Sequence, residues 1–206
     1  MRLILSGGGN AESVMPIDEL FANQIDLQKT VLYIPVAMEA HVFSYDECFE
    51  WIEKTYKPYG IKNIEMCTNL NSVVIGDQYS SVFIGGGNTF KLLKEIKESG
   101  FDKKLASYLR HDGLLYGGSA GAIICGKTIE GALYLDTNNV GLTDLTGLDL
   151  VGGKDVFCHY KGNADENEFI KNYLGDLYVL YEESGLFIQG SKIESVGKMF
   201  LCKSCN

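Results

Sequence analysis

The sequence predicts an α/β fold of three layers, in which a mostly parallel sheet carries helices on both faces. Short apolar runs rich in β-branched residues alternate with longer stretches whose apolar residues recur at helical spacing. Two of the short runs end in Gly-Gly-Gly-Asn, and a third ends in Gly-Gly-Ser-Ala-Gly. Strands that alternate with helices in this way form parallel sheets, and ligands bind at the carboxyl ends of such strands.

The first half of the chain supplies four strands and two helices. Strands are expected at 2–6, 30–34, 61–66 and 80–84. The apolar stripes of the helices consist of Ile17, Leu20, Phe21 and Ile25, and of Val42, Tyr45, Cys48, Phe49, Ile52 and Tyr56. The second stripe stops before Pro58 and Gly60, which are residues that end helices.

The second half of the chain continues the alternation. Helices are expected around the stripe Phe90, Leu92, Leu93 and Ile96, over 101–110, over 120–125 and after 163. Strands are expected at 114–116, 155–158, 177–181 and 186–189. At this length the whole chain, 1–206, is expected to form one domain.

Composition narrows the partners and the compartment. The formal net charge of −9 disfavours nucleic acid and anionic membranes as partners, because clusters of lysine and arginine are absent. No apolar run is long enough for a membrane span or a secretory signal, so we expect a cytoplasmic protein. Six scattered cysteines favour reduced thiols. The C-x-x-C of Cys202 and Cys205 has no second pair that would complete a zinc site, and we expect an incidental tail there.

The segment 117–121 matches the G-x-S-x-G pattern of a nucleophile elbow around Ser119. In an elbow the serine lies on a strained strand-to-helix turn, and flanking glycines relieve the crowding. The following helix points its N-terminal amides and the positive end of its dipole at any negative charge that forms beside the serine. The alternative is a glycine turn that only packs a helix on the sheet. Ser119 is therefore a candidate nucleophile.

Glycine clusters at 7–9, 85–87 and 117–118 each follow a strand, so we expect all three on one edge of the sheet. Neither Gly-Gly-Gly-Asn completes a dinucleotide-binding fingerprint, and neither is directly followed by the lysine of a P-loop. The backbone amides of the 85–88 turn, together with that of Ala120, instead suit an oxyanion hole.

A nucleophilic serine needs a base, usually histidine, and the chain has three histidines. His111 precedes the strand that leads to Ser119, which places it roughly 13 Å or more away. His41 and His159 both follow strands at the expected edge. The position of His159, at the end of the 155–158 strand and before a loop, favours it over His41.

The third member of such a site is a carboxylate that orients the imidazole. The candidates are Asp136, Asp144, Asp149, Asp165, Glu182 and Glu183. Glu182 and Glu183 follow the strand at 177–181, and we take Glu183 first and Glu182 second. The order serine, histidine, acid differs from the order serine, acid, histidine of α/β-hydrolases.

A thiol nucleophile is the alternative within the enzyme class. Cys125 falls inside the helix after Ser119, where we expect it to be buried. Cys158 should face away from its neighbour His159, because successive residues of a strand point to opposite faces. Neither cysteine suits attack on a substrate at the edge that carries Ser119.

Segments spread over nearly the whole chain, in order, together resemble the peptidase E family. They are Ile34-Pro35, Gly85-Gly86-Gly87-Asn88-Thr89-Phe90, Gly118-Ser119-Ala120-Gly121-Ala122, and a later strand that ends in histidine. The resemblance implies a class I glutamine amidotransferase-like (flavodoxin-like) fold with serine as the nucleophile. Members of the family are cytosolic dipeptidases that cleave after an N-terminal aspartate. Cyanophycinase, which cuts aspartyl-arginine units, is a relative.

The resemblance also implies roles for residues of this chain. Ser119 would be the nucleophile, His159 the base and Glu183 the acid. The oxyanion would be held by amides near Gly86, Gly87 and Ala120. Peptides would be cleaved through an acyl-enzyme on Ser119 and a water activated by His159, without a metal or organic cofactor.

Two departures from the family concern the substrate. Where aspartyl dipeptidases carry arginines, the helix after His159 opens with the acidic stretch 163–168, which would repel a substrate aspartate. Near a family acid downstream of Ser119 this chain has Asn139, with Asp136 as a substitute. The residues that we expect at the substrate are Asn88, Asp136, Asn139 and Glu166. We therefore expect a neutral or basic N-terminal residue.

The expected partner is a small peptide, bound by a monomer or a homodimer. Two other functions stay open, namely a non-catalytic amidotransferase-like domain that binds a small ligand or partner, and a cyanophycinase-like isopeptide hydrolase. The presence of serine, histidine and acid at matching places favours an enzyme.

Overall fold

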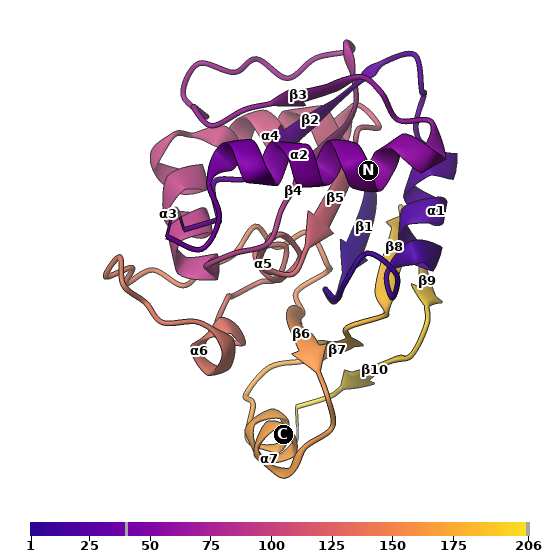
Figure 1. The fold of residues 1–206 in the computed structure, drawn as a ribbon. Helices are drawn as coiled ribbons and strands as arrows, with labels where there is room; N and C mark the ends of the chain where they lie inside the picture. Colours follow the sequence, from indigo (N-terminus) through magenta and orange to yellow (C-terminus); the bar gives the residue numbers. More distant parts are fainter. Residues whose placement is uncertain (40, 205–206) are drawn as a thin grey trace.

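The computed structural model describes residues 1–39 and 41–204 and contains two sheets (Figure 1). The larger sheet has the strand order β3-β2-β4-β5-β1-β8-β9. Its strands are β1 (Arg2–Ser6), β2 (Thr30–Ile34), β3 (Ile64–Met66), β4 (Tyr79–Ile84), β5 (Leu114–Gly118), β8 (Gly185–Gln189) and β9 (Lys192–Val196). Strands β1 to β5 pair in parallel, whereas β8 and β9 pair antiparallel. The predicted fold class, a mostly parallel α/β sheet, is confirmed.

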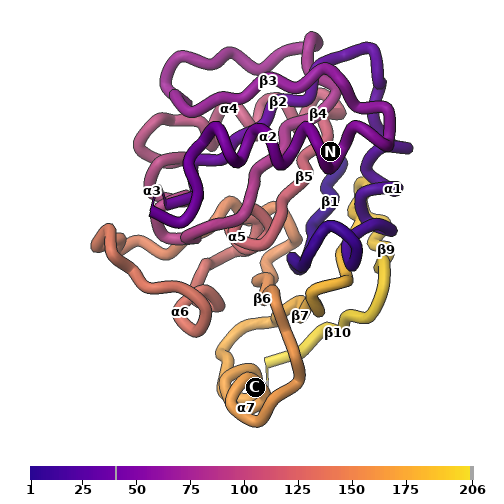
Figure 2. Tube along the Cα trace, viewed as in Figure 1, coloured from indigo at the N-terminus to yellow at the C-terminus, as the bar shows by residue number. Residues whose placement is uncertain are grey.

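Helices cover both faces of the larger sheet, as Figures 1 and 2 show. They are α1 (Met15–Gln24), α2 (Tyr45–Tyr56), α3 (Thr89–Glu98), α4 (Phe101–Arg110) and the short α5 (Ala120–Ile123), with α6 (Ala132–Leu135) and α7 (Ala164–Lys171) beyond it. Because successive side chains of a strand point to opposite faces of the sheet, neighbouring residues of one strand belong to different cores. In β1, Ile4 packs with Phe21 of α1, whereas Leu3 and Leu5 belong to the core under α3, α4 and α5.

A second, smaller sheet lies beyond the carboxyl ends of β1 and β5 (Figures 1 and 2). It has the order β10-β7-β6, formed by β6 (Asp155–Tyr160), β7 (Leu177–Tyr181) and β10 (Met199–Cys202). Its own core includes Phe157, Ile170 and Val179. The two sheets are joined at the first glycine cluster, because Gly7 N donates to Ser184 O and Gly7 O accepts from His159 N. The smaller sheet therefore brings β6 to the edge predicted to carry the site.

Several elements begin or end elsewhere than predicted, for local reasons. Helix α2 starts at Tyr45 instead of 42, because Ser44 and Glu47 form a reciprocal capping box. Strand β3 starts at Ile64, since Gly60 ends the preceding 3₁₀ turn in a left-handed conformation. The helix after Ser119 ends at Ile123, whereas β6 runs on to Tyr160.

The C-terminal strands β9 and β10 were not predicted. Strand β9 is almost entirely exposed and therefore shows no alternation of apolar and polar residues. Cys202, expected in an incidental tail, is instead the last residue of β10 and pairs with Leu177 of β7. Cys205 lies outside the described residues.

Candidate active site

The three glycine clusters meet at one edge of the larger sheet, as predicted. Strands β4, β5 and β1 are neighbours in parallel, with Ser6 of β1 in register with Gly118 of β5 and Ile84 of β4 in register with Gly117. The turns that follow these three strands therefore open on the same side.

Ser119 lies on a strained turn between β5 and α5, with φ 50° and ψ −110°. Its amide donates to Ser6 O at 3.0 Å, which fixes the turn to β1. The flanking glycines are required by close approaches, since a Cβ on Gly117 would lie 2.4 Å from Gly121 O, and one on Gly121 would lie 2.4 Å from Ile84 O. Backbone strain of this kind persists where the surroundings impose it, and it is concentrated at functional sites.

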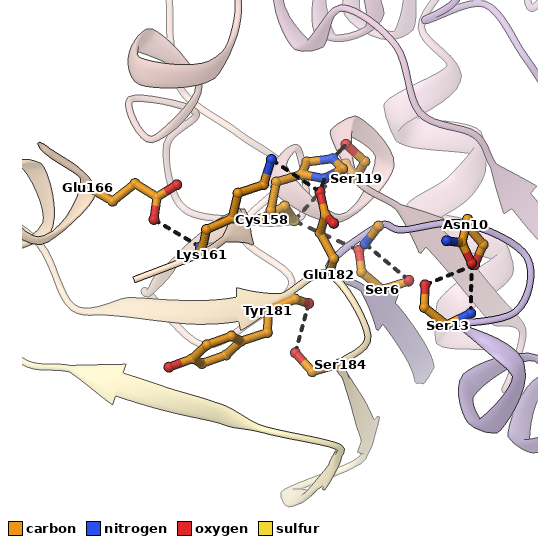
Figure 3. Close-up of polar contacts among 12 residues, drawn as sticks. Ser6, Asn10, Ser13, Ser119, Cys158, Lys161, Glu166, Tyr181, Glu182 and Ser184 are labelled. Carbon is orange, nitrogen blue, oxygen red and sulfur yellow. Dashed lines mark hydrogen bonds and ion pairs between the residues drawn. The ribbon is translucent and has the colours of Figure 1, made fainter. Parts of the chain in front are cut away.

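His159 and Glu182 complete a chain of polar contacts with Ser119. The Oγ of Ser119 lies 2.7 Å from Nε2 of His159, and Nδ1 of His159 lies 3.2 Å from Oε1 of Glu182. Ser119 and Glu182, both labelled in Figure 3, therefore contact different nitrogens of the imidazole. Both distances suit a serine whose proton passes to an imidazole oriented by a carboxylate.

The prediction that Glu183 contacts His159 is wrong, because the carboxylate in contact with the imidazole is that of Glu182. The chain turns tightly after β7, where Ser184 N donates to Tyr181 O at 3.1 Å. In that turn the Glu182 side chain is directed at the imidazole, whereas Glu183 is exposed. Lys161 approaches the same Glu182 oxygen at 3.8 Å but is 66% exposed, so solvent weakens its influence (Figure 3).

An irregularity in β6 aims His159 at Ser119. The pairing of β6 with β7 shifts register between Phe157 and Tyr160, and His159 adopts the left-handed φ of 58°. A bulge of this kind redirects a side chain out of the regular alternation of the strand. His159 N also donates to Gly7 O at 3.0 Å, which holds the bulge against the first glycine turn.

Gly8 lets the first glycine turn pass directly over the imidazole. A Cβ at Gly8 would lie 2.3 Å from Cε1 of His159, and the residue has a φ of 92°. We expect Gly8→Ala to lower kcat/KM for a cleaved peptide by about 10²-fold or more, because a displaced catalytic base loses its geometry. Steady-state kinetics measure this effect. The control is Gly141→Ala, which shares a positive φ but has nothing within 4 Å, and activity equal to that of the control would contradict the prediction.

Two of the predicted oxyanion donors, Gly86 and Gly87, line the same cleft as Ser119, and the third, Ala120, follows Ser119 in the chain. A Cβ on Gly86 would lie 3.3 Å from the Cβ of Ser119, and Gly87 adopts a φ of 135° that turns the loop close to Ala37. Within residues 1–39 and 41–204, no hydrogen bond occupies the amides of Gly86, Gly87 and Ala120. These amides are therefore available to a negatively charged oxygen beside Ser119.

Known proteins of the same family identify the chain. The sequence model of peptidase family S51 matches residues 3–196. The chain belongs to peptidase family S51. Peptidase E of Salmonella arizonae is 29% identical over 159 residues, which are 72% of this chain and 60% of that protein. Peptidase E of Salmonella typhi is 30% identical over 145 residues, which are 70% of this chain and 59% of that protein.

Two solved structures share the fold of this S51 chain. A protein from Listeria monocytogenes EGD-e, provisionally assigned to peptidase E, superposes with a TM-score of 0.77 at 24% identity, covering 95% of this chain and 97% of that one. A peptidase from an acI-B1 Actinobacterium superposes with a TM-score of 0.72 at 14% identity, covering 98% and 90%. The chain spans about 60% of the length of the Salmonella relatives.

The other two histidines lie away from the serine of this S51 chain. His111 lies at the end of α4, where its Nδ1 is 2.9 Å from Ser107 O. His41 is an exposed residue of the loop before α2. Of the three histidines, His159 is the one in contact with Ser119.

Three of the four residues predicted at the substrate have structural roles. Asn88 caps α3 and donates to Thr137 O, while Asp136 accepts from the Thr89 amide. Glu166 is buried and accepts from the amides of residues 161, 162 and 163 as part of a capping box. Asn139 is exposed in the loop after α6. The side chains of Asn88, Asp136 and Glu166 are used at helix ends, where unpaired backbone amides require them. None of the four residues lines the cleft described below.

The buried cysteines are poor nucleophiles. Sγ of Cys125 donates to Gly121 O within α5, and burial raises the pKa of its thiol to about 12. Cys158 packs beneath the site with Sγ directed at Ser6 O and Ser119 O, and burial raises its pKa well above the ordinary value. Since the thiolate is the reactive form, neither thiol competes with Ser119.

A cleft of about 430 Å³ opens beside Ser119 and His159 toward α1 and α2. Its walls are mainly aromatic, with Tyr33, Phe43, Trp51, Tyr56, Phe83 and Tyr116. Two acids, Asp18 and Glu47, line it, and no lysine or arginine does so among the described residues. The cleft therefore favours apolar or cationic groups over anionic ones.

Asp18 is a buried acid that sequence analysis missed. It is 1% exposed, and its Oδ1 accepts from the hydroxyls of Tyr56 at 2.6 Å and Tyr116 at 3.1 Å. Its Oδ2 has no hydrogen-bond partner among the residues that the structure describes. Burial raises the pKa of Asp18 to about 6, against the lowering effect of the two tyrosines. The signal in the sequence was an acid directly after Ile17 and three residues before Phe21, within an apolar helical stripe.

The Asp18 carboxylate is expected to cost stability at neutral pH. Because the folded state raises its pKa, the free energy of unfolding should fall as pH rises from 4 through 6 and stay lower above pH 6. Two pKa units correspond to about 3 kcal/mol. We expect Asp18→Asn to raise the free energy of unfolding at pH 8 by at most this amount and to raise Tm accordingly, with a smaller gain at pH 4.5. Thermal unfolding at both pH values checks this, and a gain independent of pH would contradict it.

Proposed function

We propose that the protein is a serine exopeptidase that hydrolyses dipeptides or short peptides through an acyl-enzyme on Ser119. The observation that supports this most directly is the chain of contacts from Ser119 through His159 to Glu182, at 2.7 and 3.2 Å. Membership of peptidase family S51 supplies the class of reaction.

The reaction would proceed in two steps. Ser119 Oγ attacks the peptide carbonyl carbon while its proton moves to Nε2 of His159, and Glu182 stabilises the imidazolium that forms. The carbonyl oxygen becomes negative and is held by the free amides around Ser119. The carbon–nitrogen bond then breaks, and the leaving amine takes the proton from His159. In the second step a water gives its proton to His159 and attacks the ester, which releases the acid and restores Ser119.

The N-terminal residue preferred by the enzyme is proposed to be neutral or basic instead of aspartate. The cleft beside Ser119 carries two acids and no basic side chain among its described lining residues. A substrate carboxylate would therefore meet like charge in a site of low polarity. The Salmonella relatives are named peptidase E, a name that does not specify the N-terminal substrate residue that this chain accepts.

The experiment is a screen of dipeptides that covers every N-terminal residue, read by mass spectrometry, with the wild type and Ser119→Ala side by side. Cleavage by the wild type alone, with aspartyl dipeptides among the poor substrates, is the expected result. Rapid cleavage of aspartyl dipeptides would overturn the specificity, and cleavage by neither protein would overturn the exopeptidase assignment.

We further propose that the protein works in the cytoplasm as a single domain, as a monomer or homodimer, without nucleic acid or membrane partners. The described cysteines 48, 67, 125, 158 and 202 are free thiols, as in reducing compartments. No described helix has both the length and the apolar character needed to cross a bilayer.

A further inference from the structure

We propose that the cleft beside Ser119 selects a peptide residue with a long cationic side chain, lysine or arginine, through the buried carboxylate of Asp18. The inference rests on the proposed peptidase function and deepens it, because it names the substrate class of the same site. It is carried by an acid with a free acceptor oxygen in the wall of a cleft that also contains the catalytic serine.

The first step concerns the carboxylate itself. Tyr56 and Tyr116 both donate to Oδ1 of Asp18, whereas Oδ2 is a buried acceptor that has no hydrogen-bond partner in the described part of the chain. A buried acceptor of this kind is costly unless a ligand or partner satisfies it. Asp18 is 1% exposed, so water screens its negative charge little. The charge therefore acts strongly on a charged group that enters the cleft.

The second step concerns the walls. Glu47 is the other acid in the cleft, at the start of α2, and the side chain of Trp51 follows one turn later at 47% exposure. Aromatic faces attract lysine and arginine head groups, and they cover the apolar stems of these side chains. The acids of the cleft therefore match the cationic head group of a lysine or arginine side chain, and the aromatic residues match its apolar stem.

The third step separates two sources of the cation, the α-ammonium of a peptide and a basic side chain. The hydroxyl of Tyr116 donates to Asp18. Ser119 lies three residues after Tyr116, so the Cα atoms of these two residues are roughly 10 Å apart in extended backbone. The α-ammonium is bonded to the carbon next to the attacked carbonyl, so it stays beside Ser119. A lysine or arginine side chain extends about 6 Å or more from its Cα, which brings its charge toward Asp18.

The experiment compares L-lysinamide with L-norleucinamide, which has the same α-ammonium and a stem without charge. Binding to the Ser119→Ala protein is measured by calorimetry, so that no turnover is required. We expect lysinamide to bind about 10- to 100-fold more tightly than norleucinamide. Asp18→Asn in the same background should lower this ratio of affinities at least tenfold. The matched control is Glu19→Gln, which removes a charge from the neighbouring exposed position of α1 and should leave the ratio within twofold.

The outcomes separate this inference from the proposed function. Equal binding of the two amides by the protein with Asp18 intact would overturn the cationic subsite, whether or not the Asn variant folds. A ratio that survives Asp18→Asn would overturn the role of Asp18. Cleavage of lysyl and arginyl dipeptides at least tenfold faster than norleucyl ones would support both proposals. Preference for lysinamide without cleavage of any dipeptide would keep the subsite and overturn the exopeptidase.

Discussion

Ser119→Ala is expected to lower kcat/KM for the best dipeptide by about 10⁴- to 10⁶-fold, because among residues 1–39 and 41–204 Ser119 is the nucleophilic side chain that contacts the His159 imidazole. The oxyanion amides and the cleft are untouched by the change, so binding of the substrate should persist. Steady-state kinetics and covalent labelling by a fluorophosphonate, which reacts with activated serines, measure the loss.

The control for this substitution is Ser13→Ala, in a loop close to the site. Ser13 Oγ donates to Asn10 O, and the residue does not line the cleft. Its variant should be labelled and should cleave like the wild type. Residual activity of the Ser119 variant above one hundredth of the wild type would show that another nucleophile carries the reaction.

Glu182→Gln is expected to lower kcat by about 10²- to 10⁴-fold. A glutamine leaves the shape of the site unchanged, but it removes the charge that stabilises the imidazolium. Its amide group also offers a donor to Nδ1 of His159, which favours the wrong tautomer of the imidazole. Activity measured over pH 5 to 9 should therefore fall at every pH, with KM little altered, because the contact is made to the base and not to the substrate.

Glu183→Gln provides the matched control, since the adjacent acid is exposed and makes no contact with His159 among the described residues. Its activity should stay within about threefold of the wild type, as for other exposed acids. A large loss in the Glu183 variant together with a small one in the Glu182 variant would reverse the assignment of the acid.

Local sequence was sufficient for strands β1 to β5 and β8 of the larger sheet and for the turn that carries Ser119. The apolar runs that end in glycine clusters predicted β1, β4 and β5, and the parallel connection rule placed their ends on one edge. The strained turn of Ser119 is accommodated by glycines at 117 and 121, where the neighbouring backbone comes too close for a Cβ. His159 could be chosen over His111 by its position after a strand, and over His41 by its position together with the resemblance to the peptidase E family.

Other features depended on contacts between distant segments. The sequence placed Glu182 and Glu183 at one tip, but the turn from Tyr181 to Ser184 decided which of them reaches the imidazole. The bulge at His159 has no local signature, because it arises from pairing with β7 and from the bond to Gly7. Asn88, Asp136 and Glu166 were assigned to the substrate, whereas the packed chain uses them to cap helices and hold loops.

By itself the sequence determined the α/β class, the edge of the sheet that carries the site, and Ser119 with His159 as its partner. Only the tertiary structure decided that Glu182 is the acid beside His159 and that Asp18 lies in the wall of the cleft. The physical reason is the range of the interactions. Periodicity and glycine turns are local properties of the chain, whereas the direction of a side chain and the burial of a charge depend on segments that meet only after folding.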